Sequence, residues 1–237
     1  MSYEIKEESP QRHKITRDLE NVLIMQGGGS LGSFACGVFK ALVKQKIQID
    51  IVAGTSIGAV NAAIIAGSKS DQPEKDLEDF WLEVSESNLQ IIPDLWTYEW
   101  DSYNKDFLVK KISSASINAA IFGIPKMFVP RWQWGNSSTL IRKMDEDSYY
   151  DPKNWTYIYD HSPLEKTLEK YINYKKLNLA ATQEERPNVL RLIMTAVNVM
   201  TGKPLVFDNT LTEIKAKHIL ACSGYPIYGF PWVEIED

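Results

Sequence analysis

The sequence has few cysteines and histidines, and it has no excess of positive charge. Among 237 residues there are two cysteines and three histidines, and the formal net charge of -5 provides no basic field for DNA or RNA. No apolar run reaches the roughly 18 residues that a membrane-spanning helix needs, and the N-terminus shows no signal-peptide pattern. We therefore expect a cytoplasmic protein that binds no nucleic acid, and nothing in the pattern indicates a metal or cofactor.

Both cysteines, Cys36 and Cys222, fall in predicted helices with apolar neighbours. This placement favours two packed thiols over a disulfide and suits a reducing compartment. Hydrophobic residues make up 44% of the chain, which is enough for one sizeable core, and the length allows one or two domains.

A serine occupies a tight turn between a predicted strand and a predicted helix. Residues 49–53 read as a short buried strand, and residues 57–66 form an apolar run that suits a helix ended by glycine. The turn between them reads Gly54-Thr55-Ser56-Ile57-Gly58. Such a bend exposes the serine hydroxyl at a helix N-terminus, and flanking glycines avoid a collision there. Ser56 is therefore a candidate nucleophile, with Gly54 and Gly58 as the glycines of its elbow.

A glycine-rich loop precedes this turn. Residues 21–25 form an apolar strand, and the loop that follows reads Gly27-Gly28-Gly29-Ser30-Leu31-Gly32. The helix after it is expected to bury a stripe of Leu31, Phe34, Val38, Ala41 and Leu42. Consecutive glycines leave backbone N–H groups free to point at one spot, as in an oxyanion hole. A phosphate-binding loop is the alternative, but the expected acidic residue and the Gly-Lys-Ser/Thr sequence are both missing.

Both motifs, in this order, resemble those of the patatin-like phospholipases. The resemblance runs through GGGSLGSFACGVFKAL and GTSIGAVNAAIIAG, and it returns in TAVNVMTGKPLVFDNT and HILACSGYPIYGFPWVEI. It looks closest to the bacterial and archaeal branch with a GGGxLG loop, where Leu31 replaces the arginine or lysine of many patatins. It implies a patatin-like α/β fold, with a central mixed sheet, helices on both faces and an aromatic-rich cap.

The family resemblance also implies a Ser-Asp dyad, whose aspartate stands in an Asp-Gly motif soon after an FPPV-like segment. Here the corresponding segment is Phe230-Pro231-Trp232-Val233, and the sequence holds no Asp-Gly dipeptide before it ends at Asp237. We therefore expect the 237 residues to be part of a longer protein or a truncated paralogue, with little esterase activity alone.

The remaining chain divides into an arm, a cap and further α/β elements. Residues 1–20 form a polar arm, and residues 21–237 form the domain, within which 88–159 is an aromatic-rich cap or lid. Apolar residues edged with cations at 112–129 suit an acyl-chain groove, a surface that meets lipid headgroups, or a lid packed on the core. A helix over 73–85 is expected to bury Leu77, Phe80, Trp81 and Val84.

The C-terminal part is expected to alternate helices and strands. Ser162 should cap a helix that buries Leu164 and Leu168, and 175–188 should be a surface loop. The other expected elements are strands at 189–200 and 204–207 joined by a turn, a helix at 214–223 and a last strand from 232 to 235.

These patterns predict a hydrolase that cleaves a carboxylic ester in a lipid or small ester and touches membranes peripherally. Ser56 would attack the carbonyl, and N–H groups of the loop formed by Gly27, Gly28, Gly29, Ser30 and Gly32 would hold the oxyanion. Two alternatives stay open. One is an α/β-hydrolase triad of Ser56, Asp208 and His218, and the other is a non-catalytic module that binds lipid or a partner.

Overall fold

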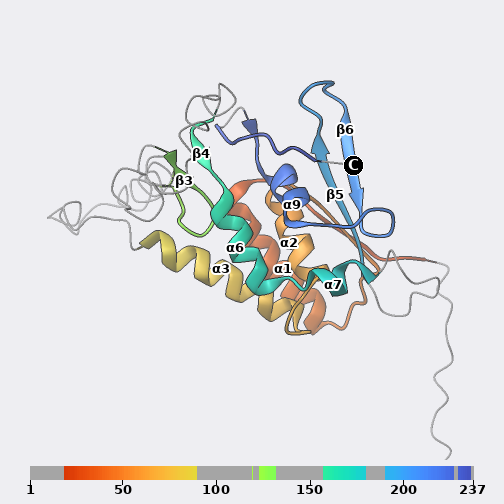
Figure 1. Ribbon diagram of the computed structural model, residues 1–237. Helices are drawn as coiled ribbons and strands as arrows, with labels where there is room; N and C mark the ends of the chain where they lie inside the picture. The colour runs from red at the N-terminus through yellow and green to blue at the C-terminus, as the bar shows by residue number, and fades with distance from the viewer. Residues whose placement is uncertain are drawn as a thin grey trace, which may run out of the picture.

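The computed structural model describes residues 19–89, 119, 123–131, 157–179, 190–226 and 229–235. These residues form a mixed α/β fold in which helices flank a four-stranded mixed sheet (Figure 1). The strands are β1 (Val22–Met25), β2 (Ile51–Thr55), β5 (Arg191–Val197) and β6 (Pro204–Asp208), in that spatial order. The first three are parallel, and β6 pairs with β5 as an antiparallel hairpin.

Two strand–helix units position the candidate site. The one-turn helix η1 (Gly29–Leu31) and helix α1 (Gly32–Lys44) follow β1, and α2 (Ile57–Ala66) follows β2 directly. In the parallel pair Met25 lies opposite Gly54. Since both strands end at the same edge of the sheet, the glycine loop after β1 and the serine turn after β2 meet there, as the sequence predicts.

The core forms around α2, in which every residue is buried. Its alanines allow close packing on the sheet and on α3 (Pro73–Leu89), which runs four residues beyond the expected end. The expected face of α3 is confirmed, because Leu77, Phe80 and Val84 are buried and Trp81 packs at its edge. Two helices, α6 (Ser162–Tyr171) and α9 (Ala216–Ser223), complete this layer.

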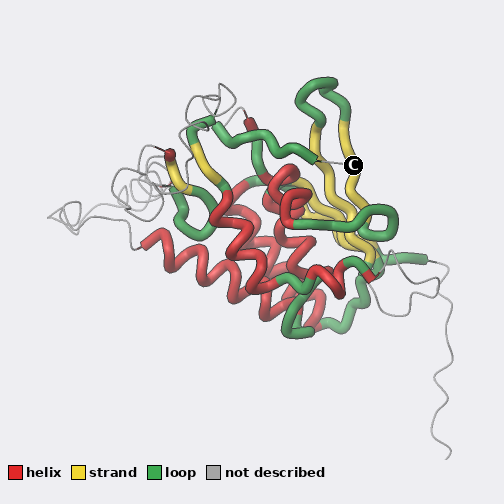
Figure 2. Tube along the Cα trace, viewed as in Figure 1, coloured by secondary structure: helices red, strands yellow, loops and turns green. Residues whose placement is uncertain are grey.

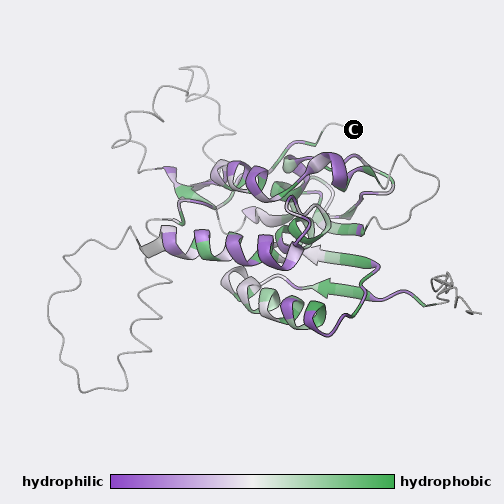
Figure 3. Ribbon diagram, turned by 90° about the horizontal axis from the view of Figure 1, so that it is seen from below, coloured by the Kyte–Doolittle hydropathy of each residue, from purple (hydrophilic) through white to green (hydrophobic). Residues whose placement is uncertain are grey.

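The described helices gather on one side of the sheet (Figure 2). Met25, Leu192 and Met194 point to that side and are buried, whereas Ile24 and Val206 are 71% and 61% exposed. The expected helices on the second face are not found in the described ranges. The strands carry mainly hydrophobic residues, and the helices carry both hydrophobic and hydrophilic residues (Figure 3). No described helix is both long and apolar enough to cross a bilayer.

Helix α1 buries a different face from the one that the sequence pattern predicts. Leu31 and Phe34 are 71% and 75% exposed, whereas Cys36 and Phe39 are buried. The reason is the close approach of Gly32, at the start of α1, to Ile57 on α2 and Trp81 on α3, which turns the stripe of Leu31, Phe34 and Val38 outward. The prediction of that stripe as the core face was wrong.

Several element ends also differ from expectation. Helix α6 begins at Ser162 itself, His161 takes the N-cap position, and the Asp160 carboxylate accepts hydrogen bonds from the Ser162 N–H and hydroxyl. A short helix, α7 (Tyr174–Leu177), lies where the start of a loop was expected. Residues 232–235 form no strand.

The expected cap over 88–159 lies mostly outside the described residues, as do residues 1–18 of the expected arm and most of 112–129. Its described parts include the short strands β3 (Val129–Pro130) and β4 (Tyr159–Asp160), which pair with each other. Ile124 and Met127 pack against the core. Cys36 and Cys222 are buried free thiols, as expected, and burial raises the pKa of each.

Candidate active site

Ser56 has a backbone conformation that non-glycine residues rarely adopt. Its φ and ψ are 56° and -130°, and it stands at the N-terminus of α2 directly after β2. Such a conformation costs about 1 to 3 kcal/mol and persists only where the surrounding structure enforces it. Here a buried strand and a fully buried helix hold the two sides of the turn. The sequence prediction of a serine on a sharp strand–helix bend is therefore confirmed.

Glycines allow three backbone segments to meet at this turn. A Cβ atom at Gly54 would lie 2.2 Å from the carbonyl oxygen of Gly58, and one at Gly58 would lie 2.1 Å from the carbonyl oxygen of Met25. A Cβ at Gly27 would lie 3.0 Å from the Cβ of Ser56. Any side chain at these positions would force the segments apart, so the glycines bring the loop after β1 against Ser56.

The glycine loop presents backbone N–H groups without internal partners. Gly28 and Gly29 have φ values of 140° and 57°, which favour glycine. The N–H of Leu31 donates to the Gly28 carbonyl, and that of Gly32 donates to the carbonyls of Gly29 and Ser30. Within the described residues, the N–H groups of Gly28, Gly29 and Ser30 donate no hydrogen bond. Gly32, expected as part of the hole, therefore has no N–H to offer.

A buried hydrogen-bond chain, which we call the Asn61 bridge, ties this loop to the helices. Trp81 Nε1–H on α3 donates to Asn61 Oδ1 at 3.0 Å, and Asn61 Nδ2–H on α2 donates to the Gly32 carbonyl at 2.9 Å. Asn61 is completely buried. A Cβ at Gly32 would lie 2.6 Å from the Trp81 ring and 2.8 Å from Ile57, the residue after Ser56. The bridge thus sets the loop relative to the serine turn.

Sequence analysis missed the Asn61 bridge. The sequence pattern predicts Trp81 as a core residue, and Asn61 stands in it as one member of an apolar helical run. A polar amide within such a run is the signal that could have identified it, because a buried amide needs hydrogen-bond partners.

The structure does not bring Asp208 and His218 together as a triad with Ser56. Both Nε–H and Nη2–H of Arg191 donate to Asp208 Oδ2, at 3.0 and 2.6 Å, while Thr210 donates to Oδ1. His218 Nδ1 accepts the N–H of Lys215, and its ring packs on Phe207. Each group is committed to a local partner, so the alternative of a Ser-Asp-His triad is not supported.

Strand register separates Asp208 from Ser56 as well. Asp208 lies opposite Ile193 on β5, whereas Thr55, which precedes Ser56, lies opposite Thr195. With about 3.3 Å per residue along a strand and about 4.8 Å between strands, the two backbones are on the order of 14 Å apart. Burial would raise the pKa of Asp208, but the Arg191 and Thr210 hydrogen bonds outweigh it and lower that pKa.

His161 is buried at the start of α6 but faces other groups. Its ring centroid lies 6.0 Å from that of Phe230, and a Cβ at Gly224 would lie 2.8 Å from its Cε1. Its Nδ1 has no hydrogen-bond partner within the described residues, and burial lowers its pKa. This environment favours an uncharged, packed imidazole.

Fold and loop geometry together define an α/β protein in which a serine elbow faces a glycine-rich loop. The chain belongs to the patatin-like phospholipase family, because the model of that family matches residues 23–237. No described group of acidic, histidine and cysteine residues could hold a metal ion.

Individual relatives match over short segments. A triacylglycerol lipase of Arabidopsis thaliana is 37% identical over 59 residues, which are 25% of this chain and 7% of the relative. Patatin-like phospholipase domain-containing protein 7 of Mus musculus is 34% identical over 73 residues, 31% of this chain and 5% of the relative. The matched segments thus span less than a tenth of these curated relatives.

Among solved structures, the ExoU–SpcU complex from the type III secretion system of Pseudomonas aeruginosa matches with a TM-score of 0.37 and 15% identity. The match covers 86% of this chain and 36% of that one.

Proposed function

We propose that this protein is a lipid acyl hydrolase in which Ser56 is the nucleophile. The observation that carries this proposal is the strained Ser56 turn, held against a loop in which the N–H groups of Gly28, Gly29 and Ser30 have no partner among the described residues. Ser56 Oγ would attack the ester carbonyl and pass its proton to a base. Collapse of the tetrahedral intermediate would break the ester C–O bond, the leaving oxygen would take the proton back from the base and depart as the alcohol, and an acyl-enzyme would remain for water to hydrolyse.

The oxyanion would be held by backbone groups. We assign this role to the N–H groups of Gly28, Gly29 and Ser30, since each such donor is worth about 3 kcal/mol in the transition state. The N–H of Ile57, directly after the nucleophile, is at the N-terminus of α2 and would add to the same field. Gly27 contributes close approach to Ser56 rather than a charge.

The base is proposed to be a carboxylate, as the resemblance to the family's Ser-Asp dyad implies. Asp208 is not proposed for this role, because Arg191 and Thr210 occupy its oxygens. His218 and His161 are not proposed either, since both are packed against other groups. In the described part of the chain, no carboxylate or imidazole hydrogen-bonds to the Ser56 hydroxyl.

The direct test is the variant Ser56→Ala, assayed with p-nitrophenyl esters of short and long acyl chains. It should lose all turnover and keep the melting temperature of the parent, since the substitution removes one hydroxyl and little packing. Ser33→Ala is the matched control, because Ser33 lies in the first turn of α1 and its exposed hydroxyl donates a hydrogen bond to the Ser30 carbonyl. Parental turnover by Ser56→Ala would refute the proposal.

A second variant separates a dyad from a triad. His218→Asn keeps an acceptor for the Lys215 N–H and should retain turnover within about tenfold of the parent, because the proposed base is not an imidazole. A loss on the order of 10⁴-fold with an unchanged melting temperature would instead support a triad that uses His218.

A further inference from the structure

The β5–β6 hairpin exposes apolar side chains at its turn. Met200 is 87% exposed, Val199 is half-exposed, and Val197 and Val206 flank them in the two strands. In Figure 1 this loop stands clear of the helices. We call residues 197–206 the hairpin tip.

Hydrogen bonds fix the conformation of the hairpin tip. Asn198 Oδ1 accepts the N–H groups of Met200 and Thr201, and the Asn198 N–H donates to the Lys203 carbonyl. Gly202 takes a φ of 67°, which closes the turn. The turn therefore holds Val199 and Met200 in solvent, which is unfavourable for apolar side chains that have no partner surface.

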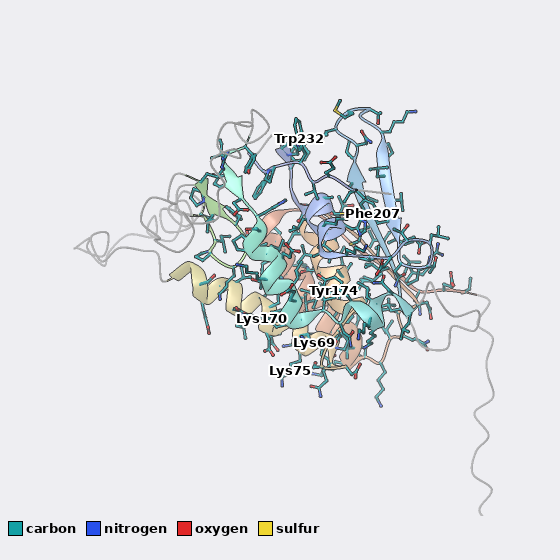
Figure 4. All side chains as sticks on the ribbon, viewed as in Figure 1. Lys69, Lys75, Lys170, Tyr174, Phe207 and Trp232 are labelled. Atoms are coloured by element: carbon teal, nitrogen blue, oxygen red, sulfur yellow. The ribbon has the colours of Figure 1, made fainter. Side chains whose placement is uncertain are left out.

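The hairpin tip projects from the edge of the sheet at which Ser56 lies. Thr55 and Thr195 are opposite each other in the parallel pair of β2 and β5, and Val197 lies two residues, or about 7 Å, beyond that level. Trp232, which is half-exposed, also lies at this upper end of the molecule (Figure 4). A surface that contacts the tip would therefore face the candidate active site.

The positive charge at the hairpin tip favours a partner surface that is negatively charged. The chain has a net charge of -5, yet residues 186–207 contain no aspartate or glutamate. Lys203 stands at the turn itself, while Arg191 pairs with Asp208 near the opposite end of the strand. Apolar residues beside a lysine suit the surface of an anionic bilayer, where the side chains enter the headgroup region and the ammonium meets phosphate.

We propose that the hairpin tip is the surface by which this protein docks on anionic lipid bilayers. Docking there would bring ester substrates to Ser56, and this consequence rests on the proposed function. The sequence pattern at 112–129 suits an acyl-chain groove, a surface that meets lipid headgroups or a lid packed on the core, and most of that segment lies outside the described residues. The main competing occupant is a second copy of the chain, paired through the same hairpin.

The test is co-sedimentation of the full chain with vesicles of phosphatidylcholine alone and of phosphatidylcholine mixed with phosphatidylglycerol. All proteins carry Ser56→Ala, so binding is measured without turnover. Met200→Asp should weaken binding to the mixed vesicles about tenfold or more, because the methionine side chain that would enter the bilayer is lost and a negative charge like that of the lipid is added. Lys203→Ser should weaken binding about fivefold, and only to the mixed vesicles.

The matched control is Leu211→Asp. Leu211 is 81% exposed and receives the same charge change, but it follows the carboxyl end of β6, at the opposite edge of the sheet from Ser56. It should bind like the parent, and melting curves establish that every variant is folded. Absent binding by the parent, or equal binding by Met200→Asp and Leu211→Asp, overturns the proposal.

Sedimentation equilibrium of the same proteins tests whether a second copy of the chain covers the hairpin tip. The docking proposal expects Met200→Asp to leave the molecular mass in solution unchanged. A parent dimer that Met200→Asp dissociates would show that a second copy covers the hairpin tip, and would overturn docking. Failure of the hydrolase proposal is seen separately, as ester turnover that does not depend on Ser56.

Discussion

The polar groups at the two ends of the central sheet differ in their hydrogen bonding. At the end where β1 and β2 finish, Ser56 is strained and the N–H groups of Gly28 and Gly29 have no partner among the described residues. At the other end, Asp208 is held by Arg191 and Thr210, and the buried Asn209 side chain bonds to the backbone of residues 177, 190 and 192.

This difference separates groups that are available to a substrate from groups that stabilise the fold. Unpaired groups and strain cost free energy, so they persist where they have a use. Paired charges and buried amides hold elements together and leave no capacity for a substrate. On this view, substitutions at the first end should affect turnover, and substitutions at the second should affect stability alone.

The largest effect is expected from Gly58→Ala. Its Cβ would lie 2.1 Å from the Met25 carbonyl oxygen, so β1 and α2 would have to separate. We expect a loss of about 3 kcal/mol or more in unfolding free energy and the loss of turnover. Urea denaturation measures the unfolding free energy. Gly37→Ala is the control, because its Cβ meets no atom within 4 Å and should stabilise α1 by about 0.5 to 1 kcal/mol. Equal stabilities for the two variants would contradict the geometry.

Asp208→Asn should lower the unfolding free energy by about 2 kcal/mol while ester turnover stays near that of the parent. The folded pKa of Asp208 is below its ordinary value, so the parent's extra stability is present above that ordinary value. It disappears as the pH falls through the folded pKa. The unfolding free energies of the parent and the variant should therefore converge at acid pH. A large fall in kcat with unchanged stability would place Asp208 in the catalytic machinery.

Trp81→Phe removes one N–H from the Asn61 bridge and leaves Asn61 Oδ1 buried without a donor. The unfolding free energy should fall by about 1 to 2 kcal/mol. The loop after β1 should also shift, which lowers kcat about tenfold or more for a soluble ester and leaves KM nearly unchanged. Trp232→Phe is the control, since Trp232 is half-exposed and lies outside the bridge. If both variants behaved alike, the bridge would have no role in positioning.

The smallest effect is expected away from both ends, at Glu83 on α3. Burial would raise its pKa, but hydrogen bonds from Lys170, Tyr171 and Lys126 outweigh burial and lower it to about 2. Its stabilisation is present above the ordinary value of 4.5 and is lost as the pH falls toward 2.

Glu83→Gln should remove that pH dependence and cost about 1 kcal/mol near neutral pH, allowing for solvent screening of the lysines. Thermal melts of both proteins across this range provide the measurement. Parallel pH profiles would show that the cluster adds nothing.

Local sequence patterns were enough to predict the serine elbow, the glycine loop and the β5–β6 hairpin. In each case glycine and a short apolar strand determine the backbone locally. The outward face of α1 was not predictable in the same way. Its apolar residues occur on more than one face, and the buried face is chosen by Gly32, which admits Trp81 from a helix about 50 residues further on.

The Asn61 bridge escaped prediction for a related reason. Its three members come from α1, α2 and α3, and their meeting depends on how these helices pack. The structure does not support the triad alternative, and the sequence could not show this, since the order of Asp208 and His218 along the chain carries no information on their partners, Arg191 and Lys215.

Covalent labelling of Ser56 tests the central claim most directly. A fluorophosphonate probe reacts with a serine that is activated and faces an oxyanion hole, and peptide mass spectrometry identifies the modified residue. Our account predicts one adduct, on Ser56, that disappears in Ser56→Ala, weakens in Trp81→Phe and persists in Ser33→Ala and Asp208→Asn. Absence of labelling at Ser56, or an adduct on another serine that persists in Ser56→Ala, would contradict it.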